Sequence, residues 1–430
     1  MTRFRFFNPG HFHAALVLRE SSPRIDNSIV VYCDPGPELE AFINLVNSFN
    51  MRDHDPTHWQ IEVRPGDLNT LVDDPEADVV VLAGRNHKKL ETISPLVNAG
   101  KHVFADKPWL TNSDQTGLLE AALDGPGFVM DIMTIRHEIL SRLCHEIVHS
   151  DDVFGGFADS SVERPAIALE SIHHLYKLVG GKPLRRPAWY FDCAQQGDGI
   201  VDIQSHMIEQ AMWFVVDDAA VSPTDVQLFS AHRWPTPVDK DLFSQITGSA
   251  EYPFSIAGDV DPDGVLQYPC NGEIIWSLNG VVIQQRAQWR DREPEGAGDM
   301  HRLILHGKAG DIHVEQGPQT DFQAQVTLKP AFTPARPGNL EALLTNAREA
   351  LPRWQQRFPG LSLSCESDGL RFHAPAILDS GHESHFPLVR DRFLDLIDQP
   401  AEHPPLYSRI KSRYGLIAQA RTLALSGANQ

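Results

Sequence analysis

A lysine, a carboxylate and an imidazole stand in this sequence where they could move a proton to or from a substrate hydroxyl. Lys107 follows a short apolar run at 102–105 and precedes Pro108, which restricts the lysine to extended backbone and so directs it across the strand end. Asp202 and His206 are i and i+4, so on a helix they share one face. A carboxylate beside an imidazole orients it and strengthens it as a base. We interpret Lys107, Asp202 and His206 as catalytic residues.

The elements that must position Lys107 alternate along the first part of the chain. Apolar runs rich in Val, Ile and Phe occur at 3–7, 28–33, 60–63, 78–84, 102–105 and 128–133, with helix-like segments between them. Nearly continuous apolar runs are typical of parallel strands buried on both faces of a sheet. We therefore predict a doubly wound α/β Rossmann-type domain over residues 1–135, which binds its ligand beyond the carboxyl ends of the strands.

The segment after the first predicted strand partly matches a dinucleotide fingerprint. Asn8, Gly10 and His13 occupy the three positions of Gly-x-Gly-x-x-Gly. Asn8 tolerates left-handed backbone and Gly10 keeps an open backbone, whereas His13 departs from the usual small residue. Asp34 ends the second strand, where an acid hydrogen-bonds an adenosine ribose. Because a carboxylate there repels a 2′-phosphate, the pattern favours NAD over NADP.

Two longer stretches carry a family resemblance. "AGRNHKKLETISPLVNAGKHVFADKP" (83–108) and "QQGDGIVDIQSHMIEQAMWF" (195–214) resemble the glucose–fructose oxidoreductase / inositol dehydrogenase (Gfo/Idh/MocA) family, in a branch with an enlarged C-terminal domain. The sequence departs from the family in having Asp106 where Glu is usual. The resemblance implies NAD-dependent chemistry at the three catalytic residues, with the cofactor bound by Asn8, Gly10, His11, Phe12, Asp34, Gly84, Asn86, His87, Asp106 and Lys107.

Residues 136–430 are expected to form an α+β domain for substrate binding and oligomerisation. Short alternating runs at 225–330 predict a largely antiparallel sheet, and the resemblance implies that this sheet is open. A Pro-rich linker (329–339) precedes a helical insert (340–356), and a final helical region (386–425) is expected to pack back on the first domain. We assign four candidate substrate-binding residues, Arg136, His174, Trp189 and Tyr190. For Arg136 a solvated position near a helix start, and for Trp189 core packing, are the competing interpretations.

Composition excludes several other classes of protein. The 430 residues carry a formal net charge of −20, which argues against nucleic-acid partners and anionic membrane surfaces. The five cysteines include no C-x-x-C pair, which predicts free thiols in the cytoplasm. We expect no signal peptide before the strand that starts within "MTRFRFF", and no membrane span. "GHESHF" (381–386) lacks the His-Glu-x-x-His spacing, so we assign no metal site.

The leading hypothesis is an NAD-dependent oxidoreductase acting on a secondary alcohol of a sugar, polyol or glycoside. One alternative is a glycosidase or lyase in which NAD oxidises the sugar transiently and elimination follows. Another is a sensor that binds the dinucleotide without turnover, against which Lys107, Asp202 and His206 count. The resemblance also implies a homo-oligomer, a dimer or a tetramer, assembled through the C-terminal sheet.

Overall fold

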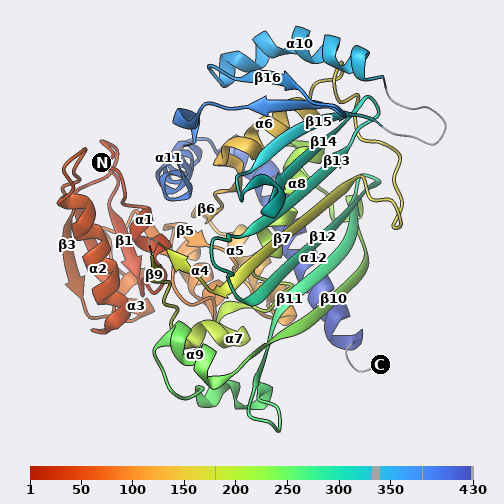
Figure 1. The fold of residues 1–430 in the computed structure, drawn as a ribbon. Coiled ribbons are helices and arrows are strands. Elements are labelled where there is room, and N and C mark those ends of the chain that lie inside the picture. The colour runs from red at the N-terminus through yellow and green to blue at the C-terminus, as the bar shows by residue number, and fades with distance from the viewer. Residues whose placement is uncertain (180, 332–338, 380, 428–430) are drawn as a thin grey trace. The chain divides into compact units, whose positions relative to one another are not determined.

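A computed structural model describes residues 1–179, 181–331, 339–379 and 381–427. The chain divides into two compact units (Figure 1). The first comprises Met1–Glu138 and Ser380–Tyr414, and the second comprises Ile139–Asp379 and Gly415–Gln430. Most of the predicted Pro-rich linker, 332–338, lies outside the described residues.

The first unit is built on a parallel sheet. Among the described residues it has six strands in the order β3-β2-β1-β4-β5-β6, each parallel to its neighbours. The strands are β1 (Phe4–Phe7), β2 (Ser28–Tyr32), β3 (Gln60–Arg64), β4 (Val79–Leu82), β5 (His102–Asp106) and β6 (Val129–Ile132). The helices are α1 (His13–Leu16), α2 (Pro37–Asn50), α3 (Leu68–Val72), α4 (Lys89–Asn98), α5 (Thr116–Leu123) and α11 (His385–Ile397). This is the predicted Rossmann-type fold, and the order reverses between β1 and β4, where such sheets bind ligands.

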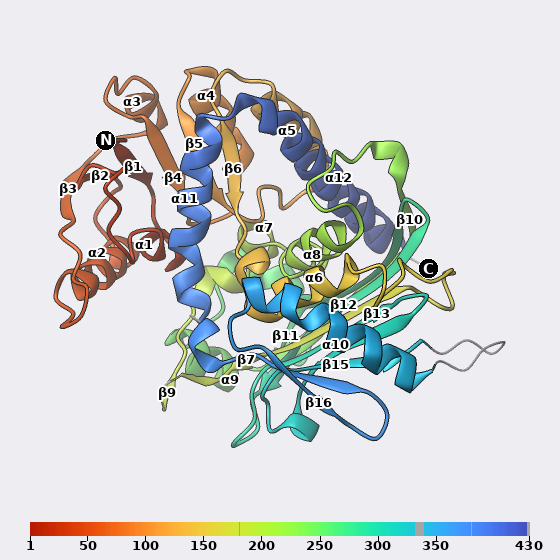
Figure 2. The ribbon, with the colours of Figure 1, turned by 90° about the horizontal axis from the view of Figure 1, so that it is seen from above.

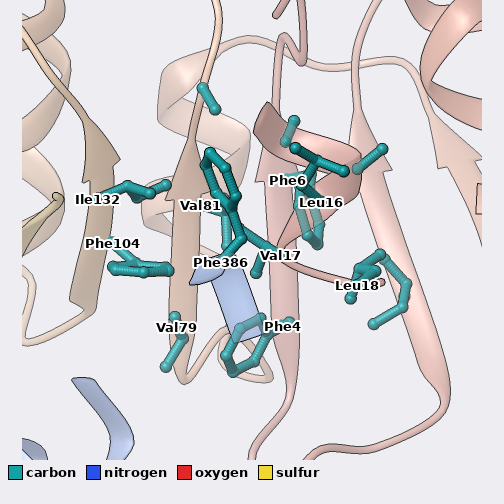
Figure 3. Close-up of a cluster of buried hydrophobic side chains, with 14 of the residues drawn as sticks. Phe4, Phe6, Leu16, Val17, Leu18, Val79, Val81, Phe104, Ile132 and Phe386 are labelled. Atoms are coloured by element: carbon teal, nitrogen blue, oxygen red, sulfur yellow. The ribbon is translucent and has the colours of Figure 1, made fainter. Parts of the chain in front are cut away.

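The core of the first unit joins both of its chain segments. Phe4, Phe6 and Phe104 are fully buried in the sheet, and Phe386 and Phe393 of α11 belong to the same apolar cluster. Figure 3 shows Phe386 lying among side chains of the sheet and of the segment after β1. Burying an aromatic side chain of this size stabilises a fold by about 2–3 kcal/mol. The late helix is therefore part of this core.

The second unit is built on a mixed, mostly antiparallel sheet. Its described residues give nine strands in the order β10-β11-β12-β7-β13-β14-β15-β17-β16. Only the β12–β7 pair is parallel. The strands are β7 (Ile167–Tyr176), β10 (Val226–Val238), β11 (Leu266–Leu278), β12 (Val281–Arg292), β13 (Met300–His306), β14 (Gly310–Gln316), β15 (Gln325–Pro330), β16 (Ser362–Cys365) and β17 (Leu370–His373); β8 (Leu178–Val179) and β9 (Lys182–Pro183) form a separate pair.

Helices of the second unit pack along this sheet. Figure 2 shows α6 (Ile139–Val148) beside α8 (Gln204–Val216), and α8 contacts β11 and β12. Gln285 of β12 donates to the carbonyl of Gln204, which ties the start of α8 to the sheet. The predicted insert forms α10 (Leu340–Arg357), where Asn339 caps the N-terminus by accepting from the amides of Glu341 and Ala342. The other helices are α7 (Cys193–Gln196), α9 (Lys240–Thr247) and α12 (His403–Gly427), whose residues up to Tyr414 belong to the first unit.

The described chain also bears on the state of the cysteines and on membrane-spanning helices. All five cysteines lie in it and are unpaired. None of its helices is both long enough and apolar enough to cross a bilayer.

Candidate active site

The backbone after β1 and the backbone after β4 come together where the strand order of the first unit reverses. Asn8 has a φ of 46°, in the left-handed region. The amides of Gly10 and His11 both donate to the carbonyl of Ala83, each at 3.1 Å. A Cβ on Gly84 would lie 2.4 Å from the Asn8 carbonyl oxygen, so only glycine fits there. The two segments thus form a tight turn at the position where a dinucleotide fingerprint acts.

Several side chains predicted to bind the cofactor lie near this turn. Asp34 is exposed just beyond β2, where it can accept from a ribose hydroxyl. Phe12 is apolar yet 52% exposed, so it offers a ring surface for a planar ligand. Asn86 is buried and His87 is exposed in the segment after β4. Because α1 has only four residues, this binding would depend more on the turn and these side chains than on a helix dipole.

His13, the residue that departs from the fingerprint, contacts the carboxylate of the Asp-Lys-Pro motif. Its Nδ1 atom lies 2.9 Å from Oδ2 of Asp106, and the Nδ1 atom of His11 lies 3.5 Å from the same oxygen. The His13 ring packs on Phe386, with ring centroids 4.5 Å apart. The imidazole therefore fills the place of the small third residue and links two loops that carry candidate site residues.

Asp106 is ionised in this setting. Burial opposes its ionisation, but the charge and hydrogen bond of His13, together with His11 and Lys89, hold the pKa of the carboxyl well below its usual range. Burial, with the neighbouring His13, lowers the pKa of His11 well below its ordinary value, so His11 is neutral near pH 7. The other carboxylate oxygen of Asp106 is buried and has no hydrogen-bond partner among the described residues.

Lys89 is a buried cation that the sequence analysis missed. Its Nζ atom donates to Oδ1 of Asn86 and to the carbonyl oxygen of Asp106, both at 2.6 Å. It begins α4 and is 4% exposed, which fixes the segment after β4 against the end of β5. The two adjacent lysines in "NHKKLE" could have indicated a cation here, but nothing in the sequence shows that Lys89 is buried and Lys88 exposed.

Lys107 directly follows β5 and is 8% exposed. Its bond to Pro108 is cis, one of the geometries that the proline allows. The lysine thus lies at the carboxyl end of β5, at the same edge of the sheet as the Gly10 and Gly84 segments.

In the second unit, Asp202 and His206 lie around the start of α8. The helix begins at Gln204, so the prediction that both residues lie on one helix is wrong for Asp202, which occupies the turn before it. Gly197, which follows α7 just before that turn, has a φ of 102°, and a Cβ on Gly199 would lie 2.2 Å from the backbone of Asn271. Because this turn packs closely on β11, α8 begins only at Gln204. The buried Asp202 carboxylate accepts from Nε2 of Gln196 at 3.2 Å.

The four candidate substrate residues lie in different surroundings. Arg136 lies in a short 3₁₀ helix (Ile135–His137) of the first unit. Trp189 and Tyr190 lie in a 3₁₀ helix (Ala188–Phe191) of the second unit and are 8% and 6% exposed. Tyr190 belongs to an apolar cluster with Trp289, and burial raises its pKa. His174 lies in β7 and is 1% exposed.

Comparison with family models covers most of the chain. Residues 10–125 match the model described as "Oxidoreductase family, NAD-binding Rossmann fold". Residues 143–424 match the one described as "Putative oxidoreductase C terminal domain". A search of curated proteins finds no match.

Solved structures similar to this chain include other oxidoreductases. The chain is 32% identical to a protein described as a "putative oxidoreductase" from Parabacteroides merdae, with a TM-score of 0.93 and coverage of 99% of this chain and 98% of that one. Levoglucosan dehydrogenase in complex with NADH and levoglucosan is 15% identical, with a TM-score of 0.58 and coverage of 97% of both chains. A "putative myo-inositol dehydrogenase" from Sinorhizobium meliloti is 15% identical, with a TM-score of 0.54 and coverage of 99% and 98%. The last two likenesses show a shared fold.

Proposed function

Because the chain belongs to the Gfo/Idh/MocA oxidoreductase family, we propose that it oxidises a secondary alcohol of a sugar, polyol or glycoside with NAD as cofactor. The observation that carries the proposal is the tight turn at Gly10 and Gly84, which lies at the same edge of the sheet as Lys107, the residue after β5. Similarity to sugar dehydrogenases supports a carbohydrate substrate.

The cofactor would be held by Asn8, Gly10, His11, Phe12, Asp34, Gly84, Asn86, His87 and Asp106 together with Lys107. The exposed Asp34 carboxylate favours NAD, because it would repel the 2′-phosphate of NADP. Bound NAD supplies the hydride acceptor. Asp106, ionised and held by His13, and Lys89, held by Asn86, would keep this edge of the sheet rigid.

In this proposal the protein's own residues handle the proton. Lys107 would donate a hydrogen bond to the substrate oxygen and stabilise negative charge developing there. His206 would accept the hydroxyl proton, with Asp202 and its partner Gln196 orienting the imidazole. The candidate groups for binding the sugar are Arg136, His174, Trp189 and Tyr190, through hydroxyl hydrogen bonds and ring stacking. We also propose that the chain works as a cytoplasmic homo-oligomer, a dimer or a tetramer, assembled through the C-terminal sheet.

The test is to incubate the purified protein with NAD and a panel of sugars, polyols and glycosides while following nicotinamide absorbance and substrate loss. Stoichiometric NADH formation with one substrate class is the expected result. Loss of a glycoside without NADH accumulation would replace the proposal with a redox-neutral lyase or glycosidase. Tight NAD binding with neither outcome across the panel would favour a sensor.

A further inference from the structure

Three ligand-bearing residues of the second unit converge at one edge of its sheet. His174 lies near the carboxyl end of β7, Glu293 directly follows β12, and Asp299 directly precedes β13. In the sheet β12 pairs with β7 in parallel, and β13 pairs with β7 in the antiparallel sense. The topology therefore brings these three chain segments to the same place. One nitrogen or oxygen from each residue lies within 4.8 Å of the other two.

His174 is the unexplained member of this group. It is 1% exposed, and within the described chain neither of its ring nitrogens has a hydrogen-bond partner. Burying a polar group without a partner is costly, so such groups in native proteins call for a water, an ion or a function. Its Nδ1 atom points toward a carboxylate, at 3.7 Å from Oδ1 of Asp299, which is too long for a hydrogen bond.

The two oxygens of Asp299 have different surroundings. Oδ2 accepts from Nζ of Lys177 at 2.8 Å and lies 3.2 Å from Nδ1 of His173. Oδ1 is buried and has no partner in the described residues, although it is the oxygen that faces His174. Lys177 and His173 thus fix the carboxylate, as outer-shell partners do for a ligating carboxylate, and leave its other oxygen available.

We propose that His174, Glu293 and Asp299 bind one divalent transition-metal ion, with Zn²⁺ as the best match. Two ligands bonded to a tetrahedral zinc ion at about 2.0–2.2 Å lie about 3.4 Å apart, close to the 3.7 Å between His174 and Asp299. One imidazole and two carboxylates suit Zn²⁺, whereas Mg²⁺ and Ca²⁺ prefer oxygen ligands alone. Three protein ligands leave a fourth position for water or a small ligand.

The charges of the site are consistent with a bound cation. Asp299 and Glu293 contribute two negative charges, and Lys177 neutralises one of them through Oδ2 of Asp299. A divalent ion would offset the remaining negative charge, taking this group from −1 to +1, and would also satisfy the buried imidazole. It would fasten the segment between β12 and β13 to β7. The sequence could not reveal this site, because His174 is more than a hundred residues from both acids.

The test is calorimetric titration of Zn²⁺ into the full-length protein after chelator treatment, with metal content measured after dialysis. We expect one ion per chain and a higher melting temperature for the loaded protein. Glu293→Gln should weaken binding at least tenfold, and Glu295→Gln, an exposed acid of the same loop, should bind as the wild type does. His174→Gln should abolish Zn²⁺ binding at this site. If that variant does not fold, Glu293→Gln still tests the site, because it changes only a partly exposed acid in a loop.

Two outcomes would overturn the proposal. One is wild-type protein that takes up no stoichiometric Zn²⁺, which would show that no metal ion partners the buried His174. The other is binding that survives Glu293→Gln and is lost in His11→Gln. That result would place the ion at His11, His13 and Asp106, the other group whose ligand atoms lie within 4.8 Å. Neither outcome depends on turnover, so this test of the metal site is independent of the proposed dehydrogenase activity.

Discussion

The Nδ1 atom of His13 lies 2.9 Å from the Oδ2 atom of Asp106, although 93 residues separate the two in the chain. This pair ties the loop after β1 to the end of β5, the strand that Lys107 follows. Two departures from the family pattern, His13 for a small residue and Asp106 for Glu, are therefore in contact. The imidazole gives one oxygen of the buried carboxylate a partner.

We predict that His13→Ala destabilises the protein by about 1–3 kcal/mol, because the buried Asp106 carboxylate loses its closest partner. Chemical denaturation measures this change. His13→Asn, whose amide can donate from nearly the same place as Nδ1, should recover part of the loss. In a double-mutant cycle with Asp106→Asn the two effects should be strongly non-additive. Simple additivity would show that the contact contributes nothing.

Lys107→Ala should lower kcat at least a hundredfold and weaken NAD binding far less, because the ammonium is assigned to the substrate oxygen and general acid–base groups contribute about 10²–10⁴ in rate. His206→Ala should do the same. Steady-state kinetics and NAD titration by fluorescence separate the two effects. Lys411→Ala, which removes an exposed ion pair with Glu120, is the control and should retain full activity. Wild-type turnover in Lys107→Ala would remove this lysine from the mechanism.

Gly84→Ala should weaken NAD binding and destabilise the fold by about 1–3 kcal/mol, because its Cβ would lie 2.4 Å from the Asn8 carbonyl oxygen. Gly117→Ala is the matched control. That glycine lies in α5, and a Cβ there meets nothing within 4 Å, so the change should be neutral or stabilising by about 0.5–1 kcal/mol. Equal behaviour of the two variants in thermal unfolding and NAD titration would contradict the close approach of the two loops.

Stability should fall as the pH falls from about 6.5 to about 4, and His313 should account for part of the loss. Burial, with the nearby Lys329, lowers the pKa of His313 to about 4. Since the unfolded chain takes up this proton near pH 6.5 and the folded chain only near pH 4, protonation in that window favours unfolding. Its contribution is about 1–3 kcal/mol. Denaturation of His313→Gln at several pH values should show a shallower pH dependence; an unchanged slope would contradict the assignment.

Most strands of the first unit could be predicted because they contain short runs of apolar residues, whereas β3 (Gln60–Arg64) alternates apolar and polar residues. Val79–Leu82, buried along its whole length, is an example of such an apolar run. The sequence also indicated α10 and the free cysteines. The start of α8 could not be predicted. Asp202 has helical spacing to His206, but the tight approach of Gly199 to Asn271 holds its segment in a turn.

Contacts between distant segments account for most of what the sequence did not reveal. Nothing local says that β7 inserts between β12 and β13, since both β12–β7 and β13–β7 pairings join strands far apart in the chain. The burial of Lys89 and the pairing of His13 with Asp106 depend on the same kind of long-range packing. Residue types pointed to chemistry, but only the folded chain shows which groups share a partner.

The nucleotide-binding unit takes its last core residues from near the end of the polypeptide. Phe386 and Phe393 complete an apolar cluster whose other aromatic members include Phe4, Phe6 and Phe104. During synthesis, a nascent chain that has emerged only as far as Glu138 exposes this apolar surface to solvent. Residues Ile139–Asp379 of the second unit must be translated before α11 can cover this surface. Newly made protein is therefore expected to depend on chaperones, and truncation before α11 is expected to yield aggregates instead of a working half-enzyme.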